Sequence, residues 1–216
     1  MSLFPRRRPP NWILIIASLG CTMTVLETNA VAVALPTIAR DLQADFADIE
    51  WVISCYILTF TSLLLPAGAI ADRHGRRRVL LIGIALFALS SLTCALAPTA
   101  SALYVARALQ GVGAAFLLAP SLSVIGHEFH EGKQRDDAWA FWGTAMGMMM
   151  VLSPLIGGLL SSLWGWRSVF IAILPFLAFL AYGAIRWVPD TADTVVRPLD
   201  PPGIITFSMA IFGIVF

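Results

Sequence analysis

The sequence predicts an all-α membrane protein, in which six transmembrane helices form a bundle and a seventh helix begins. Composition is the first observation, because the 216 residues are 58% hydrophobic and only 12% charged, whereas soluble domains are about 25% charged. The second is that the hydrophobic residues form long continuous runs without the alternation typical of strands. The third is that basic residues gather in alternate loops between these runs. A soluble fold of this size could not bury so much apolar surface.

Six runs are long enough for a membrane-crossing helix, which needs about 20 apolar residues. In chain order they are Trp12–Leu35, Trp51–Ala71, Val79–Ala97, Ala102–Ile125, Ala138–Leu163 and Val169–Val188, and a seventh begins at Ile204 and runs to Phe216. The seventh run is too short to cross a bilayer by itself. We therefore expect a cytoplasmic segment over residues 1–11, a six-helix bundle over 12–188, a cytoplasmic linker over 189–203 and a truncated seventh helix over 204–216.

The basic residues predict the orientation, because loops rich in lysine and arginine stay in the cytoplasm. With a cytoplasmic N-terminus, eleven basic residues lie inside: Arg6, Arg7, Arg8, Arg73, Arg76, Arg77, Arg78, Lys133, Arg135, Arg186 and Arg197. Arg40 and Arg167 lie outside, and Arg107 lies within a span. The N-terminus is therefore expected in the cytoplasm.

Several other functions lack support in the sequence. A net charge of +1 supplies no basic field for nucleic acid. The three cysteines lie inside apolar runs without CxxC spacing, and we interpret them as small buried hydrophobic residues. His74, His127 and His130 lie in or beside inner loops, and neither G-x-S-x-G nor H-E-x-x-H occurs. We therefore expect no enzyme activity, no metal site and no cofactor.

Glu27 and Arg107 are the two ionisable residues placed well inside predicted spans. Each costs at least about 2.5 kcal/mol at a helix centre, which argues against a lipid-facing position. Glu27 lies about 13 Å and Arg107 about 8 Å inside the outer end of its run, so both could face one interior cavity. A carboxylate in such a site can bind and release a proton near neutral pH. For Arg107, a packing role satisfied by backbone carbonyls or a carboxylate is an equal alternative.

Two further segments carry unusual residues. In SPLIGG, Pro154 removes a backbone amide, and Gly157 and Gly158 add flexibility, so a helix bend is expected there. In GAIADRHGRRRVLL, the arginines can set topology, but topology does not explain the interleaved Asp72 and Gly75. Topology alone therefore does not account for the second segment.

The chain resembles the major facilitator superfamily at two motifs. GAIADRHGRRRVLL resembles the superfamily signature G-x-L-x-D-R-x-G-R-[RK] of the loop between spans two and three. The matching residues are Gly68, Asp72, Arg73, Gly75, Arg76 and Arg77, with Ile70 in place of leucine. YVARALQGVGAA resembles the span-four signature R-x-x-Q-G through Arg107, Gln110 and Gly111.

Four weaker motifs resemble the 14-span drug:proton antiporter branch. LETNAVAVALP resembles L-D-x-T-x-x-N-x-A-L-P, with Glu27 in place of aspartate and with Asn29 and Ala32 departing from the pattern. SPLIGG resembles G-P-x-x-G-G, with Ser153 in place of the first glycine. GWRSVFIAILP resembles W-R-x-x-F-x-x-N-x-P, with Leu174 in place of asparagine, and LDPPGIITF resembles the D-x-x-G that opens an extra span.

The resemblance implies the N-terminal half of the major facilitator fold and a proton-coupled antiporter for multidrug efflux. Its expected partners are a small lipophilic substrate, protons, the lipid bilayer and a missing C-terminal half, in a bacterial inner membrane. Glu27 and Arg107 would couple protons, and the substrate cavity would include Thr24, Thr28, Asn29, Gln110 and Gly111. The resemblance also implies that the loop between spans two and three is a gating loop at the inner face. There Asp72 would face a helix of the second half, and Arg76 and Arg77 would pair with acids such as Asp136 and Asp137.

Alternatives remain open at this point. The imperfect SPLIGG motif also allows a symporter or uniporter for a sugar or an organic acid. An inactive truncated half-transporter is a further possibility, since alternating access needs two halves. A seven-span receptor or assembly subunit is disfavoured by the superfamily loop motif.

Overall fold

A computed structural model describes residues 10–190 and, beyond them, residues 202, 203, 206, 209, 210 and 213. Within these residues the chain is helical and contains no strand. The helices are α1 (Pro10–Leu42), α2 (Phe46–His74), α3 (Arg76–Ala95), α4 (Ala100–Glu128), α5 (Gly132–Trp164) and α6 (Arg167–Trp187). All six are long and apolar enough to cross a membrane. The predicted six-helix all-α class is confirmed.

The expected N-terminal segment, linker and seventh helix lie mostly outside the described residues. Several helices are longer than the apolar runs that predicted them, and α1 continues from Leu35 to Leu42 through Arg40 and Asp41. A helix need not end at the bilayer surface, because its backbone hydrogen bonds are internal to the segment. The end is instead set locally, here by Gln43 with a φ of 50° and by Asp45, which caps α2 by accepting from the Asp48 amide at 2.8 Å.

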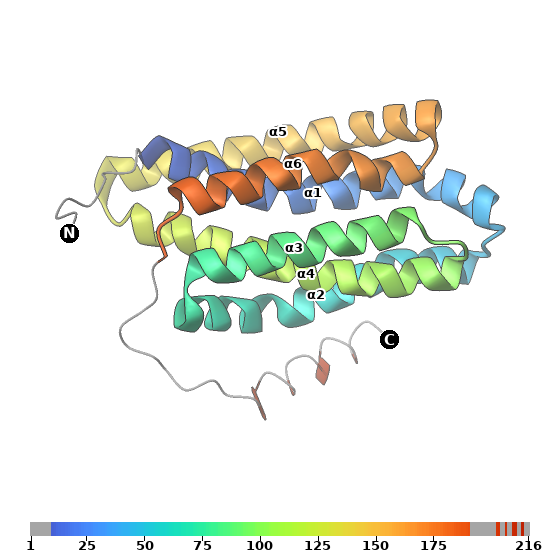
Figure 1. Cartoon of the computed structure of the whole chain (residues 1–216), viewed down its shortest axis with the longest axis horizontal. Helices are drawn as coiled ribbons and strands as arrows, with labels where there is room; N and C mark the ends of the chain where they lie inside the picture. Colours follow the sequence, from blue (N-terminus) through green and yellow to red (C-terminus); the bar gives the residue numbers. More distant parts are fainter. Residues whose placement is uncertain (1–9, 191–201, 204–205, 207–208, 211–212, 214–216) are drawn as a thin grey trace.

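The described helices form two layers. One contains α1, α5 and α6, and the other contains α2, α3 and α4 (Figure 1). Within the layers, α1 packs against α5 and α6, and α4 packs in the same way against α2 and α3. The layers meet where α1 contacts α4 and where α3 contacts α6.

These contacts have an internal symmetry. The pattern is unchanged when α1–α3, called the first triple below, is exchanged with α4–α6, the second triple. Each triple contains an odd number of helices, so the second triple crosses a membrane in the opposite sense to the first. The bundle is therefore an inverted repeat of two triples, and the first helix of each triple packs within the layer of the other.

Small residues allow the closest helix contacts. A side chain at Gly83 of α3 would collide with the backbone of Phe116 in α4, and one at Gly157 of α5 would collide with the backbone of Ala30 in α1. Small residues allow helix backbones to approach closely in lipid, where dispersion replaces the hydrophobic effect as the attraction between helices.

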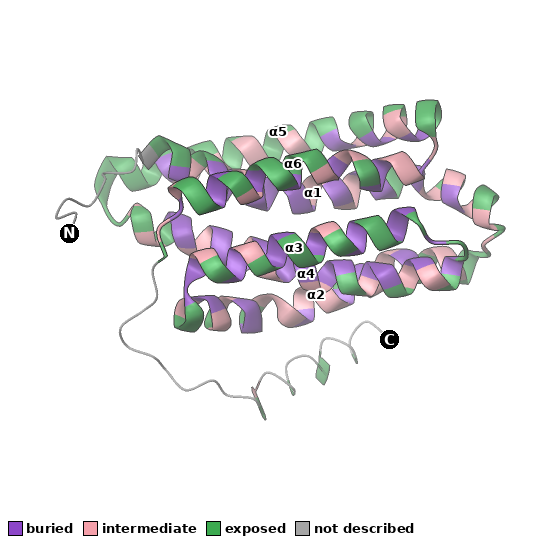
Figure 2. Cartoon of the chain, viewed as in Figure 1, coloured by how far each residue is buried: buried purple, intermediate pink, exposed green. Residues whose placement is uncertain are grey.

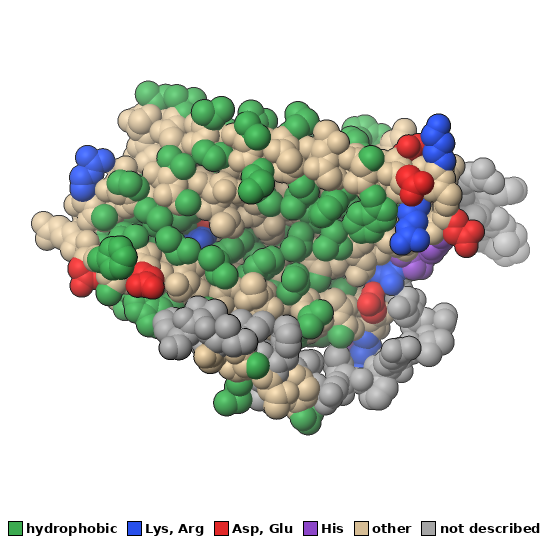
Figure 3. Space-filling view, turned by 180° about the vertical axis from the view of Figure 1, so that it is seen from behind, with side chains coloured by type: hydrophobic (Ala, Val, Ile, Leu, Met, Phe, Trp, Pro, Cys, Tyr) green, Lys and Arg blue, Asp and Glu red, His purple; other side chains and the backbone are tan. Residues whose placement is uncertain are grey.

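The outside of the bundle is apolar. Figure 2 shows exposed residues along the outer faces of the helices, most continuously on α5, and Figure 3 shows hydrophobic side chains covering the surface between two charged ends. Leu65, Leu89, Val151 and Leu155 each expose more than 60% of their surface. A water-soluble protein rarely exposes so large an apolar surface. The protein is accordingly a multi-pass membrane protein.

Candidate functional site

The two charged residues selected from the spans form a buried ion pair. Nη1 of Arg107, on α4, donates to Oε1 of Glu27, on α1. The side chains expose 2% and 1% of their surface respectively. Two positions 80 residues apart are therefore joined inside the bundle, where α1 and α4 cross between the layers.

Arg107 also has three uncharged partners. Its Nε donates to the Val52 carbonyl of α2 at 3.1 Å, and its Nη1 donates to Oε1 of Gln110 at 2.8 Å. The guanidinium carbon lies 4.1 Å from the centre of the Tyr56 ring, which is a cation–π contact. Arg107 thus has the backbone-carbonyl and carboxylate partners that the packing role requires, and its role in transport stays a prediction.

Glu27 is less completely satisfied than Arg107. Its second oxygen, Oε2, is buried and has no hydrogen-bond partner among the residues that the structure describes. Burying such an oxygen without a partner is costly, so orphaned polar atoms of this kind call for a functional explanation. Oε2 is the atom of this carboxylate that can accept a proton.

Gln110 continues the polar contacts into α3. Its Nε2 donates to Oγ of Ser91 at 2.9 Å, and the Ser91 hydroxyl donates to the Phe87 carbonyl at 2.7 Å. The Cys94 thiol lies 3.6 Å from Oε1 of Gln110. Sequence reasoning missed Ser91 and Tyr56, because each is an ordinary residue within an apolar run. Ser91 and Tyr56 differ from their neighbours only in the tertiary structure, where Ser91 contacts Gln110 and Tyr56 contacts Arg107.

The other residues expected in the substrate cavity are bonded locally. The side chains of Thr24, Thr28 and Asn29 donate to carbonyls of their own helix, at Cys21, Thr24 and Val25 respectively. Asn29 lies about 200° around the helix from Glu27, so it faces a different side of α1.

Gly111 packs directly against α2. A side chain at this position would collide with Thr59 and with the carbonyl of Tyr56. Its small size therefore serves helix packing, close to the ring that covers Arg107.

The expected bend residues lie in a continuous helix, since α5 runs without interruption from Gly132 to Trp164. Ser153 donates to the Met149 carbonyl one turn earlier. Gly157 makes the close contact with α1 described above, and Gly158 lies in ordinary contact with Val33. Gly157 thus has a packing function, and a bend at Pro154 stays a prediction.

The arginine-rich turn between α2 and α3 forms two sets of ion pairs. Nε and Nη2 of Arg76 both donate to Oδ1 of Asp72 at 3.0 Å. Beyond the end of α6, Oδ2 of Asp190 lies 3.1 Å from Nε of Arg78 and 3.5 Å from Nη2 of Arg77.

This pairing corrects the expectation for Arg77, which was predicted to pair with Asp136 or Asp137. Those two acids are exposed near the start of α5. Among the six described helices, α5 packs against α1 and α6 and does not contact α3. The end of α6 lies beside the start of α3 instead, and this places Asp190 within reach.

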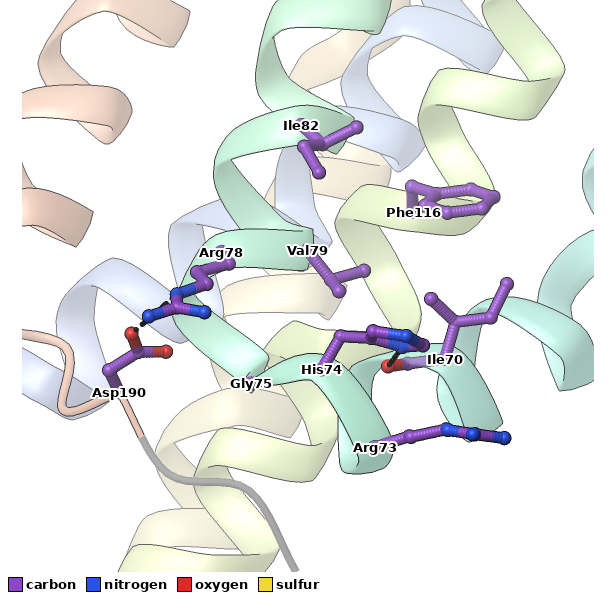
Figure 4. A pocket seen from close by; sticks show the side chains of 9 residues that line it. All are labelled: Ile70, Arg73, His74, Gly75, Arg78, Val79, Ile82, Phe116 and Asp190. Atoms are coloured by element: carbon purple, nitrogen blue, oxygen red, sulfur yellow. Dashed lines mark hydrogen bonds and ion pairs between the residues drawn. The ribbon is translucent and has the colours of Figure 1, made fainter. Parts of the chain in front are cut away.

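Gly75 is the tightest point of this turn. Its φ is +100°, which a residue with a side chain rarely adopts, and a side chain would also meet the carboxylate of Asp190. A hollow of about 670 Å³ opens beside it, between α2, α3 and Phe116 of α4. Figure 4 shows Arg78 directed at Asp190 at one side of this hollow, and His74 bonded to the Ile70 carbonyl.

The remaining residues of the loop motif do not line one site. Gly68 is half-buried on α2, with its nearest side-chain neighbour, Ala119, at ordinary van der Waals distance. Arg73 is exposed at the edge of the hollow.

A polar cluster closes the opposite end of the bundle. Oδ2 of Asp41 accepts from Nε1 of Trp166 at 2.8 Å and from Nη1 of Arg167 at 2.5 Å. Nη2 of Arg167 donates to the Ala97 carbonyl at 3.2 Å, which ties the turn before α6 to the end of α3. Sequence reasoning singled out the Trp–Arg pair but not Asp41.

Comparison with known proteins places this geometry in context. Residues 15–216 match the protein family described as the Major Facilitator Superfamily. Over 212 residues the chain is 37% identical to the methylenomycin A resistance protein of Streptomyces coelicolor, covering 98% of this chain and 44% of that protein. Over 203 residues it is 35% identical to the multidrug resistance protein Stp of Mycobacterium tuberculosis, covering 94% and 38% respectively.

The fold has a close match among solved structures. The crystal structure of a peptide transporter, POT, in complex with sulfate superposes with a TM-score of 0.74 at 18% identity, covering all of this chain and 46% of the other. This likeness concerns the fold alone. The chain spans less than half the length of the two resistance proteins and of the peptide transporter.

Proposed function

The chain belongs to the Major Facilitator Superfamily, a family of transporters, and from that premise we propose that it forms one half of a proton-coupled drug exporter. The exporter would expel lipophilic drugs or other small toxic compounds across a bacterial inner membrane by alternating access. The observation that carries the proposal is the buried Glu27–Arg107 pair, in which the second carboxylate oxygen has no hydrogen-bond partner among the described residues.

Glu27 carries the proton in this mechanism, and Arg107 is the fixed charge. While Glu27 is ionised, the arginine compensates its charge in a medium where an isolated carboxylate would be very costly. When a proton binds the carboxylate, the ion pair is lost, but Arg107 keeps the Val52 carbonyl, Gln110 and the Tyr56 ring. The arginine therefore stays in place while the acid changes its charge.

Substrate and proton compete for the same carboxylate. A lipophilic cation or a hydrogen-bond donor would bind the unpaired oxygen of Glu27 when the proton is absent and alternating access has exposed the carboxylate. Thr24 and Thr28 lie within one turn of Glu27 and would supply further hydrogen-bonding groups beside it. The functions for which the two relatives are named, methylenomycin A resistance and multidrug resistance, support a lipophilic toxic cargo.

The second half of the transporter would pack against α2 and α5. These helices do not contact each other within the described bundle, and both expose large apolar side chains. A side chain added at Gly143 or Gly147 of α5 would meet no atom of the described residues within 4 Å, which leaves room for another helix. The chain corresponds to 44% and 38% of the length of the two resistance proteins, which supports the presence of a second half.

The turn between α2 and α3 would lie at the cytoplasmic face, as the distribution of basic residues predicts. There Asp72, Arg76, Arg77 and Asp190 form an ion-pair cluster that would close the inner side of the cavity. Asp72 also remains 41% exposed, so it is accessible to a helix of the second half.

Transport into inside-out membrane vesicles tests the proposal with the complete protein. Acidifying the vesicle interior should drive uptake of a fluorescent lipophilic cation such as ethidium. Glu27→Gln should abolish this uptake, and Glu50→Gln, which changes an exposed acid at the start of α2, should retain it. Full pH-driven uptake by Glu27→Gln would refute the proton-carrier role. Accumulation of substrate in the same direction as the proton would support a symporter instead.

A further inference from the structure

We propose that Ser91 and Gln110 are positioning residues that aim the guanidinium of Arg107 at Glu27. The proposal rests on the proton-coupled function and deepens it. It also moves Gln110 from the substrate cavity, where the sequence placed it, to the support of the arginine. The three residues form one chain of hydrogen bonds from α3 to α4, which ends at the ion pair with α1.

The direction of the Gln110 amide decides which atom meets Arg107. A glutamine amide has an accepting oxygen at one end and a donating nitrogen at the other. Its Nε2 donates to Ser91 at 2.9 Å, and this turns Oε1 toward Nη1 of Arg107 at 2.8 Å. A reversed amide would place two N–H groups against the cationic guanidinium and would repel it.

Ser91 enforces this direction because its own proton is already used. The hydroxyl donates to the Phe87 carbonyl at 2.7 Å, so it faces Gln110 as an acceptor. The backbone of α3 thus fixes the serine, the serine fixes the amide, and the amide fixes the arginine. The Cys94 thiol, 3.6 Å from the same Oε1, adds a weak donor on the same side.

The hydrogen bonds from Ser91 through Gln110 to Arg107, called the relay below, are buried, and this raises the free-energy cost of breaking them. Ser91 and Gln110 each expose 0% of their surface, so water cannot replace a lost partner. Removing one partner of a buried hydrogen bond leaves the other unsatisfied, which costs more than the bond itself contributed. Loss of the serine hydroxyl therefore frees the amide to rotate, and Arg107 is no longer held at one orientation relative to Glu27.

The adjacent Ser90 provides a matched control. It is 5% exposed, and its hydroxyl bonds to the Leu86 and Phe87 carbonyls of its own helix. Ser90→Ala removes the same atoms as Ser91→Ala from the same turn of α3 without reaching Gln110. An effect specific to Ser91 is therefore an effect of the relay.

The ionisation of Glu27 reports the relay directly. In the complete, detergent-solubilised protein, the infrared band of the protonated carboxyl can be followed against pH and assigned by its loss in Glu27→Gln. Ser91→Ala should move the midpoint of this titration to higher pH by about half a unit or more, because the ionised carboxylate has lost part of its counter-charge. Ser90→Ala should leave the midpoint unchanged.

The infrared band isolates one group among several neighbours. Arg107 pairs with Glu27 from α4, the Tyr56 ring of α2 covers the same guanidinium, and the Cys94 thiol of α3 lies 3.6 Å from Oε1 of Gln110. From α5 and α6, no titratable side chain of the described residues forms an ion pair or hydrogen bond with Glu27. Because the carboxyl band excludes thiols and phenols, a shift in its midpoint belongs to Glu27.

A double-variant comparison separates the relay from independent packing effects. If Ser91 acts through Gln110, the double variant Ser91→Ala/Gln110→Leu should shift the midpoint no further than Gln110→Leu does. Additive shifts would overturn the relay, as would equal midpoints in wild type and Ser91→Ala, or equal shifts in Ser91→Ala and Ser90→Ala. A midpoint shift without any proton-driven transport in the wild type would support the relay and refute the proposed function.

Transport kinetics give a second measurement. Ser91→Ala should reduce the rate of proton-driven uptake by about three- to tenfold at saturating substrate, with little change in KM, because Ser91 does not touch the substrate. Ser91→Thr keeps the hydroxyl and should recover most of the rate. A change confined to KM would overturn the positioning role.

Discussion

Arg77 and Arg167 occupy equivalent positions in the two triples. Each lies two residues after a glycine with positive φ, in the first turn of the third helix of its own triple. Arg77 pairs with Asp190 just beyond α6, and Arg167 donates to the Ala97 carbonyl just beyond α3. Each arginine therefore ties its own turn to the end of the third helix of the other triple, at opposite ends of the bundle.

Because Gly75 lies in one of these two turns, any side chain at this position should lower the stability of the folded protein. Gly75→Ala should destabilise the protein by about 2 kcal/mol or more, because a positive φ is strained for alanine and the methyl group also meets Asp190. Gly132→Ala, with a φ of +66° and open surroundings, should cost only the backbone strain, about 1 kcal/mol. Unfolding in mixed detergent micelles measures both. Adding Asp190→Ala to Gly75→Ala should restore part of the loss, and equal losses for the two glycine variants would contradict the contact.

The buried ion pair should respond unequally to loss of either partner. Arg107→Leu leaves a buried carboxylate without a counter-charge and should cost about 3–5 kcal/mol of unfolding free energy. Glu27→Gln should cost less, about 1–2 kcal/mol, because Arg107 keeps the Val52 carbonyl, Gln110 and the Tyr56 ring. Unfolding of the purified variants at neutral pH compares them. A larger loss for Glu27→Gln would mean that the arginine depends mainly on the acid.

The contact between α5 and α1 should tolerate no added methyl group. Gly157→Ala places a side chain against the backbone of Ala30 and should cost about 1–3 kcal/mol. The matched change is Gly126→Ala, on an exposed part of α4 with nothing nearby, which should be neutral or stabilising by about 0.5–1 kcal/mol. Thermal unfolding in detergent distinguishes the two, and unchanged stability in Gly157→Ala would show that the helices can separate without loss.

The predicted orientation can be checked by labelling single cysteines. In a background lacking Cys21, Cys55 and Cys94, a membrane-impermeant maleimide should react with Arg40→Cys on intact cells. Arg73→Cys should react only after the cells are opened, because the positive-inside rule places the α2–α3 turn in the cytoplasm. The reverse pattern would invert the topology and would place the arginine-rich cluster at the outer face.

Much of the fold could be predicted from the sequence because the determining forces act locally. A helix in lipid satisfies its backbone hydrogen bonds within one segment, so a run of about 20 apolar residues predicts a span without knowledge of its neighbours. The same reasoning selected Glu27 and Arg107, since a charge within such a run is costly wherever the helix lies. The sequence predicted that Glu27 and Arg107 lie at a similar depth in the membrane, but it did not predict the ion pair between them.

The identity of neighbouring helices was decided by the tertiary structure. In lipid the hydrophobic effect does not choose between helices, and shape and polar contacts decide instead. The structure therefore places Asp190 beside Arg77, where the sequence favoured Asp136 or Asp137. It also distinguishes Ser91, which supports Gln110, from the adjacent Ser90, which bonds only within its own helix. The spans followed from local hydropathy, and their partners followed from packing between segments far apart in the chain.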